Sequence, residues 1–321
     1  MSPLESIKAS LDPELTRLNE LIHEQLSTDN PLMTDIIEGY LRSKGKQIRP
    51  LVVMLSARLF GQIDDKVLSA AAAVELLHNA SLIHDDVVDE SKLRRGIPTI
   101  NALWDNHIAV LIGDYFVSAA LHRAIATADM DIVSTVGRLG TLLSLGEIDQ
   151  IYNTREHELS EEAYYRIINF KTASLFVACA RVGCYATGAP ARQADTLAEV
   201  AELLGLCFQI RDDVFDYFPA DKVGKPTGND LREGKVTLPL LHALEVAPDP
   251  AMLELATRQS LDPDQVELLQ RYAREAGGIE YAYASMARLR DRALALMATL
   301  PPGPADDSIA QLFDYIISRD F

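Results

Sequence analysis

Apolar residues recur along this chain with the period of an α-helix, over almost its whole length. Stretches rich in Ala and Leu, such as LSAAAAVELLHNA, are separated by short breaks such as LSTDNP and ATGAPA. Ala and Leu favour helix, and the helix breakers Gly and Pro number only 17 and 15 in 321 residues. The pattern predicts an all-α protein with ten or more helices.

One segment interrupts the helical pattern for longer than the others. Residues 218–239, FPADKVGKPTGNDLREGKVTLP, are rich in Gly, Lys and Asp. Loops longer than about 12–15 residues are usually functional or disordered. Because this segment is not low in sequence complexity, we expect a functional loop inside a single domain over residues 1–321. A division into two domains at this loop is the less favoured alternative.

The charge balance limits the partners of the chain. It has 47 acidic and 30 basic residues, and its net charge is −17. Nucleic acid binding is disfavoured because phosphate contacts need a basic face, and an anionic lipid surface is a poor general partner. No run of about 18 apolar residues is found, so no membrane span is predicted. The N-terminus lacks a signal-peptide core and the three cysteines lack metal-ligand spacing, which together favour a cytoplasmic location.

A dense acidic cluster, SLIHDDVVDESKLRRG, ends the helix predicted over residues 67–91. At 100° per residue, Asp85 and Asp89 are one turn apart, with Asp86 on the flank. His78 lies two turns earlier, on nearly the same stripe. Like charges four residues apart cost roughly a few tenths of a kcal/mol on an exposed helix, and more in a cleft. A divalent cation would remove this penalty, and Mg²⁺ is typically held by one or two carboxylates plus substrate phosphates.

The same acidic spacing occurs a second time. The stretch CFQIRDDVFDYF contains Asp212, Asp213 and Asp216, again behind an apolar run. A single cluster of this kind is more often a solvated helix face, but two clusters more than 120 residues apart are hard to explain as surface. If the two helices face each other, the carboxylates line one cleft and hold several Mg²⁺ ions.

Basic residues lie near both acidic clusters in the sequence. Lys46 and Arg49 stand between Gly45 and Pro50, and Arg94 follows the first cluster directly. Together these bases outline a site for phosphate groups, and arginine is suited to bidentate phosphate contacts. The remaining members of this basic set are Arg95, Lys171 with its neighbour Thr172, and the loop residues Lys225 and Lys235.

These segments resemble the trans-isoprenyl diphosphate synthases, and the resemblance covers nearly the whole chain. Two DDxxD motifs together with LRRG favour chain elongation over terpene cyclisation, because cyclases have an Asn/Ser/Glu pattern as their second metal motif. One departure is Arg211, where the family more often has an apolar or small residue, and it is given no role. The segments in the family's order are GKQIRP, LLHNASLIHDDVVDESKLRRG, GDYFVSAAL, GEIDQ, FKTASLF, QIRDDVFDY and GKPTGNDLREGKVTLPLL.

The resemblance implies an all-α helical bundle of the isoprenoid synthase type around a deep central cavity, usually as a homodimer. It also implies the reaction and its two substrates. An allylic diphosphate loses pyrophosphate, isopentenyl diphosphate attacks the resulting cation, and loss of a proton leaves a product five carbons longer. Metal ions and fixed bases would stabilise the charge on the departing pyrophosphate, which can itself take the proton.

The resemblance further implies roles for single residues. Six aspartates would bind Mg²⁺, three ions per substrate-bound site, with Asp85, Asp89 and Asp212 as main ligands and Asp86, Asp213 and Asp216 as supporting or water-mediated ligands. The bases expected at the allylic diphosphate are Arg94, Lys171 and Lys235, with Lys225 as a further phosphate-binding base. The residues expected at isopentenyl diphosphate are Lys46, Arg49, His78 and Arg95. Those expected beside the developing cation are Thr172 and Gln209.

The residues before the first motif bear on product length. Ala80 and Ser81 would lie at the wall of the cavity, where short-chain members of the family carry a bulky residue. Both are small here, so the product is predicted to be longer than farnesyl: geranylgeranyl at least, with a long-chain polyprenyl diphosphate favoured. Further along the cavity, Phe116, Leu121 and His122 are expected to form a floor.

Two alternatives of other classes are weighed against this interpretation. An HD-type metal phosphohydrolase would use His84 and Asp85, but it needs further histidine ligands that the seven histidines do not obviously supply. A non-catalytic regulatory subunit of a heteromeric prenyltransferase would usually lack acids from one metal motif, whereas both motifs are intact here. The sequence favours the enzyme.

Overall fold

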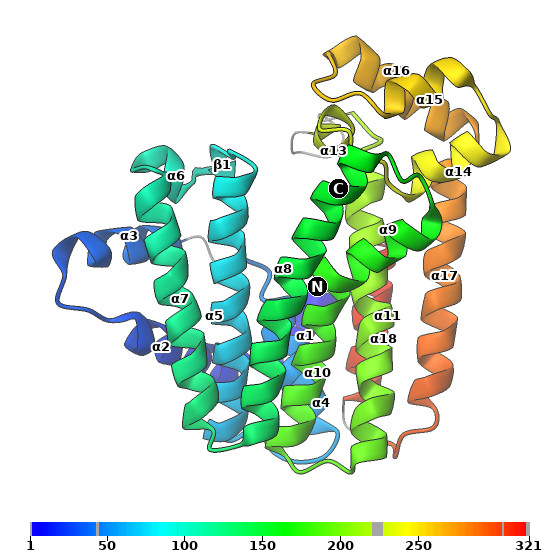
Figure 1. Ribbon diagram of the computed structural model, residues 1–321. Coiled ribbons are helices and arrows are strands. Elements are labelled where there is room, and N and C mark those ends of the chain that lie inside the picture. Colours follow the sequence, from blue (N-terminus) through cyan, green and yellow to red (C-terminus); the bar gives the residue numbers. More distant parts are fainter. Residues whose placement is uncertain (1, 43–44, 95, 220–226, 304, 319–321) are drawn as a thin grey trace. The chain divides into compact units, whose positions relative to one another are not determined.

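The computed structural model describes residues 2–42, 45–94, 96–219, 227–303 and 305–318 (Figure 1). This part of the chain is almost entirely helical, which confirms the predicted all-α fold class. Its strands, β1 (Leu93–Arg94) and β2 (Ile97–Pro98), form one antiparallel ribbon. The helices are α1 (Pro3–Ala9), α2 (Asp12–Leu26), α3 (Pro31–Leu41), α4 (Ile48–Arg58), α5 (Asp65–Val88), α6 (Ile100–Leu103), α7 (Asn106–Ala126), α8 (Met130–Glu156), α9 (Glu161–Ile168), the π-helix η1 (Asn169–Ala173), α10 (Ser174–Ala186), α11 (Ala191–Phe215), α13 (Asn229–Arg232), α14 (Leu238–Val246), α15 (Pro250–Ala256), α16 (Pro263–Glu275), α17 (Gly278–Met297) and α18 (Asp306–Ser318).

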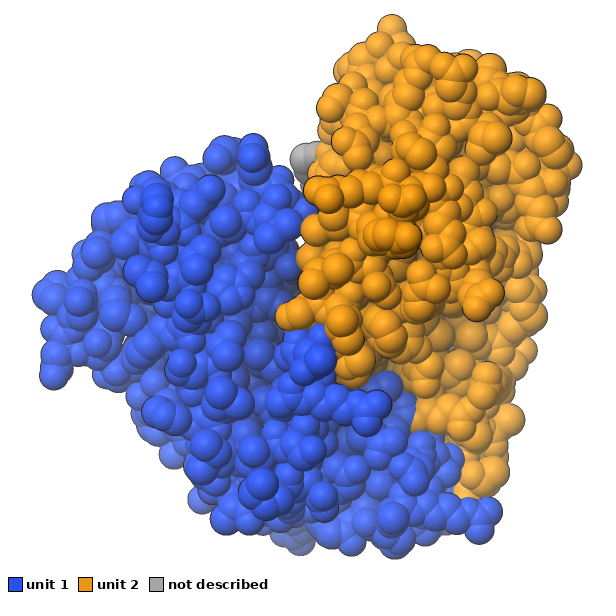
Figure 2. Space-filling view, viewed as in Figure 1, with its two compact units in different colours: residues 1–141, 175–198, 300–309 blue, residues 142–174, 199–299, 310–321 orange. Residues whose placement is uncertain are grey.

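The chain divides into two compact units, each assembled from three segments (Figure 2). Unit 1 comprises residues 1–141, 175–198 and 300–309, and unit 2 comprises residues 142–174, 199–299 and 310–321. The division does not fall at the predicted loop of residues 218–239, which belongs entirely to unit 2. The single domain over residues 1–321 stays a prediction. The first acidic motif belongs to unit 1 and the second to unit 2.

Unit 1 is organised by the long helix α5, which packs against α2, α4 and α7. Its first turn is capped by Asp64, whose carboxylate accepts hydrogen bonds from the backbone N–H groups of Lys66 and Val67, both at 3.0 Å. The alanines at 70–73 are fully buried, and their small side chains let neighbouring helices approach α5 closely. Figure 1 shows α5 and α7 side by side. The first acidic motif occupies the C-terminal end of α5.

Glycine sets the approach of α4 and α10 within unit 1. A Cβ atom at Gly183 would lie 2.4 Å from the carbonyl oxygen of Val53 and 3.0 Å from Cβ of Ser56. Neither atom can rotate away, because one belongs to the backbone and the other is fixed to it. Since α4 carries Arg49 in its first turn, this packing also positions a predicted substrate-binding base.

Unit 2 is organised by α11, whose apolar side is buried at Leu203, Ile210 and Val214. In the same unit, α14 packs against both α16 and α17. At the start of α17, a Cβ atom on Gly278 would lie 2.1 Å from the carbonyl oxygen of Pro239. The backbones of α14 and α17 therefore approach each other where only glycine fits. The second acidic motif lies at the C-terminal end of α11.

The three cysteines are free and buried. Burial raises the pKa of the Cys184 and Cys207 thiols to about 12, so both stay protonated at neutral pH. Burial also raises the pKa of the Cys179 thiol. Such thiols are inert packing groups.

Three helical stretches in the described residues are long and apolar enough to cross a membrane, judged by length and composition alone. These Ala-rich helices reach the required hydropathy without an unbroken apolar run, and the absence of a membrane span stays a prediction. Of the apolar windows, 67% is buried in Asp65–Val88 and 72% in Glu161–Ala186, but only 39% in Asn106–Ala126. Packing inside the protein explains the apolar character of Asp65–Val88 and Glu161–Ala186, whereas α7 keeps an exposed apolar face.

Gly183→Ala is expected to destabilise the protein by roughly 1–3 kcal/mol, the usual cost of overpacking a core. The matched control is Gly137→Ala on α8, where a Cβ would meet nothing within 4 Å and the higher helix propensity of alanine should stabilise slightly. Thermal denaturation of both variants measures the difference. A Gly183→Ala melting temperature equal to or above that of the wild type would contradict the close approach of α4 and α10.

Candidate active site

The first acidic motif ends α5 one turn earlier than predicted. The helix stops at Val88 rather than continuing to residue 91, because Glu90 adopts a left-handed backbone with φ of 51°. The predicted spacing is kept, since the backbone N–H of Asp89 donates to the carbonyl oxygen of Asp85 at 2.8 Å. Asp89 is exposed and Asp85 is half-buried, so both carboxylates remain accessible to a ligand.

Asp86 differs from its two neighbours because it is buried and holds Arg94. Its two carboxylate oxygens accept hydrogen bonds from Nε of Arg94 at 2.9 and 3.0 Å, and Nη2 lies 2.7 Å from Oδ1. Asn101 donates to the backbone carbonyl of Asp86 at 3.1 Å and closes the turn. The bidentate pair fixes the Arg94 guanidinium beside the motif. The predicted metal-supporting role of Asp86 stays a prediction, and Arg95 lies outside the described residues.

The residues predicted at isopentenyl diphosphate all lie in unit 1. His78 is buried on α5, seven residues before Asp85 and therefore on nearly the same stripe. Arg49 lies in the first turn of α4, where its guanidinium stacks over Phe176 with 5.6 Å to the ring centroid. Lys46 is exposed just before that helix. Pro50 belongs to the first turn of α4, where proline is tolerated.

His84 makes its contacts with residues of α7. Its Nε2 lies 3.3 Å from the carbonyl oxygen of Val110 and 3.3 Å from Oδ1 of Asp114. A Cβ atom at Gly113 would lie 2.2 Å from the same nitrogen, so the ring fills the space that this glycine leaves. Such contacts are structural and give no support to an HD-type phosphohydrolase.

The second acidic motif has one carboxylate that organises the loop after α11. Asp216 lies just beyond the helix, and its Oδ2 accepts a hydrogen bond from the backbone N–H of Asp230 at 2.9 Å. Gln270 donates to the backbone carbonyl of Asp216 at 2.6 Å. Asp212, one turn earlier, is only half-buried. The carboxylate of Asp212 is therefore accessible to a ligand. Asp216 also holds the backbone of the loop at Asp230 in place.

Asp213, the middle carboxylate, is buried with 3% of its surface exposed. Tyr164 on α9 donates to its Oδ2 at 2.6 Å, and Gln209 on α11 donates to its Oδ1 at 2.7 Å. Burial, followed by the charge of Asp230, raises the pKa of Asp213 well above its ordinary value, although the two donated hydrogen bonds act in the opposite direction. Gln209 in turn accepts from the Thr172 hydroxyl at 2.7 Å, which brings the two predicted cation-facing residues together.

Lys171 is held by residues to which the sequence analysis gave no role. Its Nζ lies 2.5 Å from Oε2 of Glu147 and donates to Gln150 at 3.1 Å. A Cβ atom at Gly146 would lie 2.7 Å from Cγ of Lys171 and 2.9 Å from its backbone nitrogen, so only glycine lets the lysine approach α8. Lys171 sits in the π-helix η1, and π-turns occur often at functional sites. Glu147 and Gln150 both belong to the segment GEIDQ, noted for its family resemblance, which is the signal that could have identified them.

Lys235 completes the described set of phosphate-binding bases. Its Nζ lies 2.7 Å from Oε2 of Glu233, and its backbone N–H donates to the carbonyl oxygen of Asp230 at 2.8 Å. Lys225 lies outside the described residues. Lys235 therefore shares with Lys171 and Arg94 the feature that a carboxylate holds its cationic group.

Arg211 is explained by packing. The residue is buried, its guanidinium lies over the rings of Phe215 at 4.6 Å and Tyr283 at 5.1 Å, and it donates to the Tyr283 hydroxyl. These contacts tie α11 to α17 within unit 2. The arginine is thus a core group with a flat, stackable cation.

The two positions predicted to control product length differ in burial. Ala80 is fully buried on α5, whereas Ser81 is half-buried and its hydroxyl donates to the carbonyl oxygen of His78 at 2.9 Å. Their place at a cavity wall stays a prediction.

The three residues predicted to form a floor of the cavity differ in burial. Phe116 is fully buried on α7 and packs edge-on against Tyr40, with 5.6 Å between ring centroids. Leu121 and His122 are exposed instead. Five residues turn an α-helix by about 140°, so Leu121 points to the other side of α7 from Phe116.

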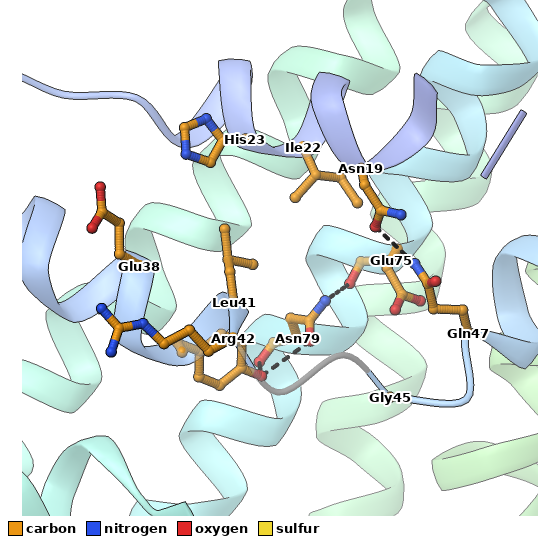
Figure 3. A pocket seen from close by; sticks show the side chains of 11 residues that line it. Asn19, Ile22, His23, Glu38, Leu41, Arg42, Gly45, Gln47, Glu75 and Asn79 are labelled. Atoms are coloured by element: carbon orange, nitrogen blue, oxygen red, sulfur yellow. Dashed lines mark hydrogen bonds between the residues drawn. The ribbon is translucent and has the colours of Figure 1, made fainter. Parts of the chain in front are cut away.

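A pocket of about 380 Å³ lies in unit 1 between α2, α3 and α5 (Figure 3). Its polar side chains bond one another: Tyr40 donates to Asn79 at 3.0 Å, and Gln47 donates to Asn19 at 2.9 Å. None of the predicted site residues is among those that line it, although Asn79 directly follows His78. Two further lining residues, Gly45 and Gln47, directly flank Lys46 in the sequence.

The carboxylates suit a metal that substrate helps to bind. Among the described residues, no group of three His, Cys, Asp or Glu side chains is arranged to hold a metal ion alone. Mg²⁺ keeps several waters and is usually bound by one or two carboxylates plus substrate phosphates, so a closed protein cage is not required. Asp85 and Asp89, accessible and one turn apart, and the accessible Asp212 fit this mode of binding.

Comparisons with known proteins agree over the whole chain. The family model described as polyprenyl synthetase matches residues 30–273. The chain is 32% identical over 320 residues to octaprenyl diphosphate synthase of Escherichia coli strain K12, with 99% of each covered. The structure of a decaprenyl diphosphate synthase from Rhodobacter capsulatus matches with a TM-score of 0.93 and 32% identity, covering 99% of both chains. A polyprenyl synthase from Caulobacter crescentus CB15, solved with calcium and isoprenyl diphosphate, matches with a TM-score of 0.92 and 31% identity, covering 99% of this chain and 98% of that one.

The family model matches most of the chain, and these relatives align from end to end. The resemblance to trans-isoprenyl diphosphate synthases and the predicted enzyme class, a prenyltransferase, are therefore confirmed. The chain belongs to the polyprenyl synthetase family.

Proposed function

We propose that the chain is an all-trans polyprenyl diphosphate synthase, which joins isopentenyl diphosphate head to tail to an allylic diphosphate. The observation that carries the proposal is the pair of intact DDxxD motifs, each at the C-terminal end of a long helix and each accompanied by bases held in place. A regulatory subunit would not need both motifs, and the contacts of His84 give no support to a phosphohydrolase.

Membership of this family implies dependence on a divalent metal ion. Mg²⁺ is the proposed ion, three per substrate-bound site, with Asp85, Asp89 and Asp212 as the main ligands. When bound, it would stabilise the negative charge that develops on the departing pyrophosphate. Arg94, Lys171 and Lys235 add fixed positive charge at the allylic diphosphate, and their carboxylate partners keep them ordered before substrate arrives.

Isopentenyl diphosphate is proposed to bind Lys46, Arg49 and His78, with Arg95 outside the described residues. The stacking of Arg49 over Phe176 fixes the plane of its guanidinium, which favours bidentate contact with a phosphate. Thr172 and Gln209 supply oxygen atoms to the allylic cation. Because neither is a base of useful strength, the pyrophosphate released in the reaction is the proposed acceptor of the final proton.

The product is longer than farnesyl diphosphate, and a long-chain polyprenyl diphosphate is the proposed outcome. Two of the relatives named above are an octaprenyl and a decaprenyl diphosphate synthase. The small side chains of Ala80 and Ser81 leave room before the first motif, where a bulky residue would stop a growing chain.

We propose a homodimer in the cytoplasm. The exposed apolar face of α7 supports the dimer, because Leu111 and Ile125 leave 63% and 61% of their surface exposed, far more than core residues do. A membrane surface is the alternative occupant of this face. The buried, protonated thiols agree with a reducing compartment.

Asp85→Ala and Asp212→Ala are each expected to lower kcat roughly 100-fold or more. Without a metal ligand, the negative charge on the departing pyrophosphate is no longer neutralised, so the allylic diphosphate ionises more slowly. Turnover is measured with Mg²⁺, farnesyl diphosphate and labelled isopentenyl diphosphate. Asp65→Ala, an exposed aspartate in the first turn of α5, is the matched control and should keep wild-type turnover. Near-normal turnover of either motif variant in folded form would contradict the proposed metal ligands.

Arg49→Ala should raise KM for isopentenyl diphosphate roughly 10-fold or more and leave KM for the allylic substrate nearly unchanged. Arg94→Ala should do the reverse, since each change removes a charge-assisted hydrogen bond to one diphosphate. Steady-state kinetics with one substrate varied at a time separates the two values. Arg17→Ala is the control, because Arg17 is a half-buried arginine on α2 that pairs with Glu20. Equal effects of Arg49→Ala and Arg94→Ala on both KM values would refute the two-pocket assignment.

Ala80→Phe and Ser81→Phe should shorten the product to farnesyl or geranylgeranyl diphosphate, because a packed core cannot move aside for a phenyl ring without about 1–3 kcal/mol of strain. Ser81 is the milder position because it is only half-buried. Chromatography of dephosphorylated products measures chain length, and Ser81→Ala should leave it unchanged. An unaltered product distribution in a folded Phe variant would show that these positions do not form the cavity wall.

A further inference from the structure

The buried hydroxyl of Tyr164 begins a chain of three hydrogen bonds that ends at Thr172. Tyr164 donates to Oδ2 of Asp213 at 2.6 Å, Gln209 donates to Oδ1 of Asp213 at 2.7 Å, and Thr172 donates to Oε1 of Gln209 at 2.7 Å. Tyr164, Asp213 and Thr172 are each less than 9% exposed. The sequence analysis gave Tyr164 no role.

The direction of each hydrogen bond in this chain follows from the first one. Tyr164 and Gln209 each donate to one oxygen of Asp213, so this side chain acts as an acceptor at both of its oxygens. Because Tyr164 occupies Oδ2, Oδ1 remains for Gln209, which must present its N–H₂ end there. The carboxamide of Gln209 therefore turns its oxygen to Thr172. In the absence of Tyr164, Oδ2 would have no donor from α9 and the carboxylate would be free to rotate.

The consequence reaches the Thr172 hydroxyl. Its single hydrogen is committed to Gln209, so any other group that meets the oxygen meets lone pairs. An oxygen that offers lone pairs stabilises an allylic cation and does nothing for a diphosphate anion. Such an interaction grows as charge develops in the transition state, and it should therefore appear in kcat rather than in KM.

We propose that Tyr164 is a positioning residue for the ionisation step: through Asp213 and Gln209 it holds the Thr172 oxygen in an acceptor-only state towards the allylic cation. This inference rests on the proposed chain elongation. It separates Asp213 from Asp85, Asp89 and Asp212, because it gives this buried carboxylate an orienting role in place of the predicted role as a supporting metal ligand.

The first test is Tyr164→Phe, with Tyr165→Phe as the matched control. Tyr165 is the next residue of α9, its ring packs edge-on against that of Tyr164 at 5.4 Å, and its hydroxyl bonds to Ser285. Tyr164→Phe should lower kcat roughly 10- to 100-fold, the factor that a lost hydrogen bond to a charged group corresponds to. Both KM values should stay within about twofold of wild type, and Tyr165→Phe should keep wild-type kcat. A wild-type kcat for Tyr164→Phe, or a loss in KM alone, would overturn the proposal.

A double-mutant cycle with Thr172→Val shows whether Tyr164 acts through Thr172. If it does, Tyr164→Phe should slow the Thr172→Val enzyme by less than about twofold, because the oriented oxygen is already absent. Fully multiplicative losses would overturn the proposal. The same cycle measured on solvolysis of the allylic diphosphate alone, without isopentenyl diphosphate, should give the same pattern, since the effect belongs to ionisation.

Asp213→Asn keeps the test decisive if Tyr164→Phe does not fold. A carboxamide has one acceptor and one donor end, so it cannot accept hydrogen bonds from both Tyr164 and Gln209. The expected result is a lower kcat with an unchanged Mg²⁺ requirement and an unchanged KM for the allylic substrate. A raised Mg²⁺ requirement would mean that Asp213 is a metal ligand and would overturn the proposal. If the wild type itself elongates nothing, it is the proposed function that fails.

Discussion

Negative charge is the constraint on which the rest of this structure depends. A chain with a net charge of −17 presents two aspartate clusters to substrates that are themselves multiply charged anions. Carboxylates and diphosphates repel one another, so the aspartates are useful only if cations join them to the substrate. No three ligands in the described residues form a metal cage by themselves, which suits ions that bind together with the diphosphate.

The same constraint explains how the fixed bases are held. Three cationic groups proposed at the allylic diphosphate each have a carboxylate partner: Arg94 with Asp86 at 2.7 Å, Lys171 with Glu147 at 2.5 Å, and Lys235 with Glu233 at 2.7 Å. A paired base is ordered before substrate arrives, so less conformational entropy is lost on binding. The partners also account for part of the acidic excess that the composition alone attributes to solubility.

The sequence predicts the reacting residues of this site better than the residues that hold them in place. The 3.6-residue period and the spacing of Asp85 and Asp89 depend on local geometry, which a helix repeats wherever it forms. Tyr164 was missed because its partner is 49 residues away, and only tertiary packing brings a tyrosine of α9 to a carboxylate of α11. Glu147 was missed for the same reason, although GEIDQ was noticed. The exposure of Leu121 was missed because the prediction used the size of the side chain and not the side of α7 from which it projects.

Metal ions that join the aspartates to a diphosphate are central to the proposed mechanism, and substrate binding without chemistry tests their role most directly. An unreactive thio-linked analogue of farnesyl diphosphate can be titrated calorimetrically into the purified protein with Mg²⁺ and again with EDTA. The account predicts measurable binding with Mg²⁺ and a loss of at least roughly 100-fold in affinity with EDTA, as charge neutralisation worth several kcal/mol requires. Equal affinity under both conditions would contradict it.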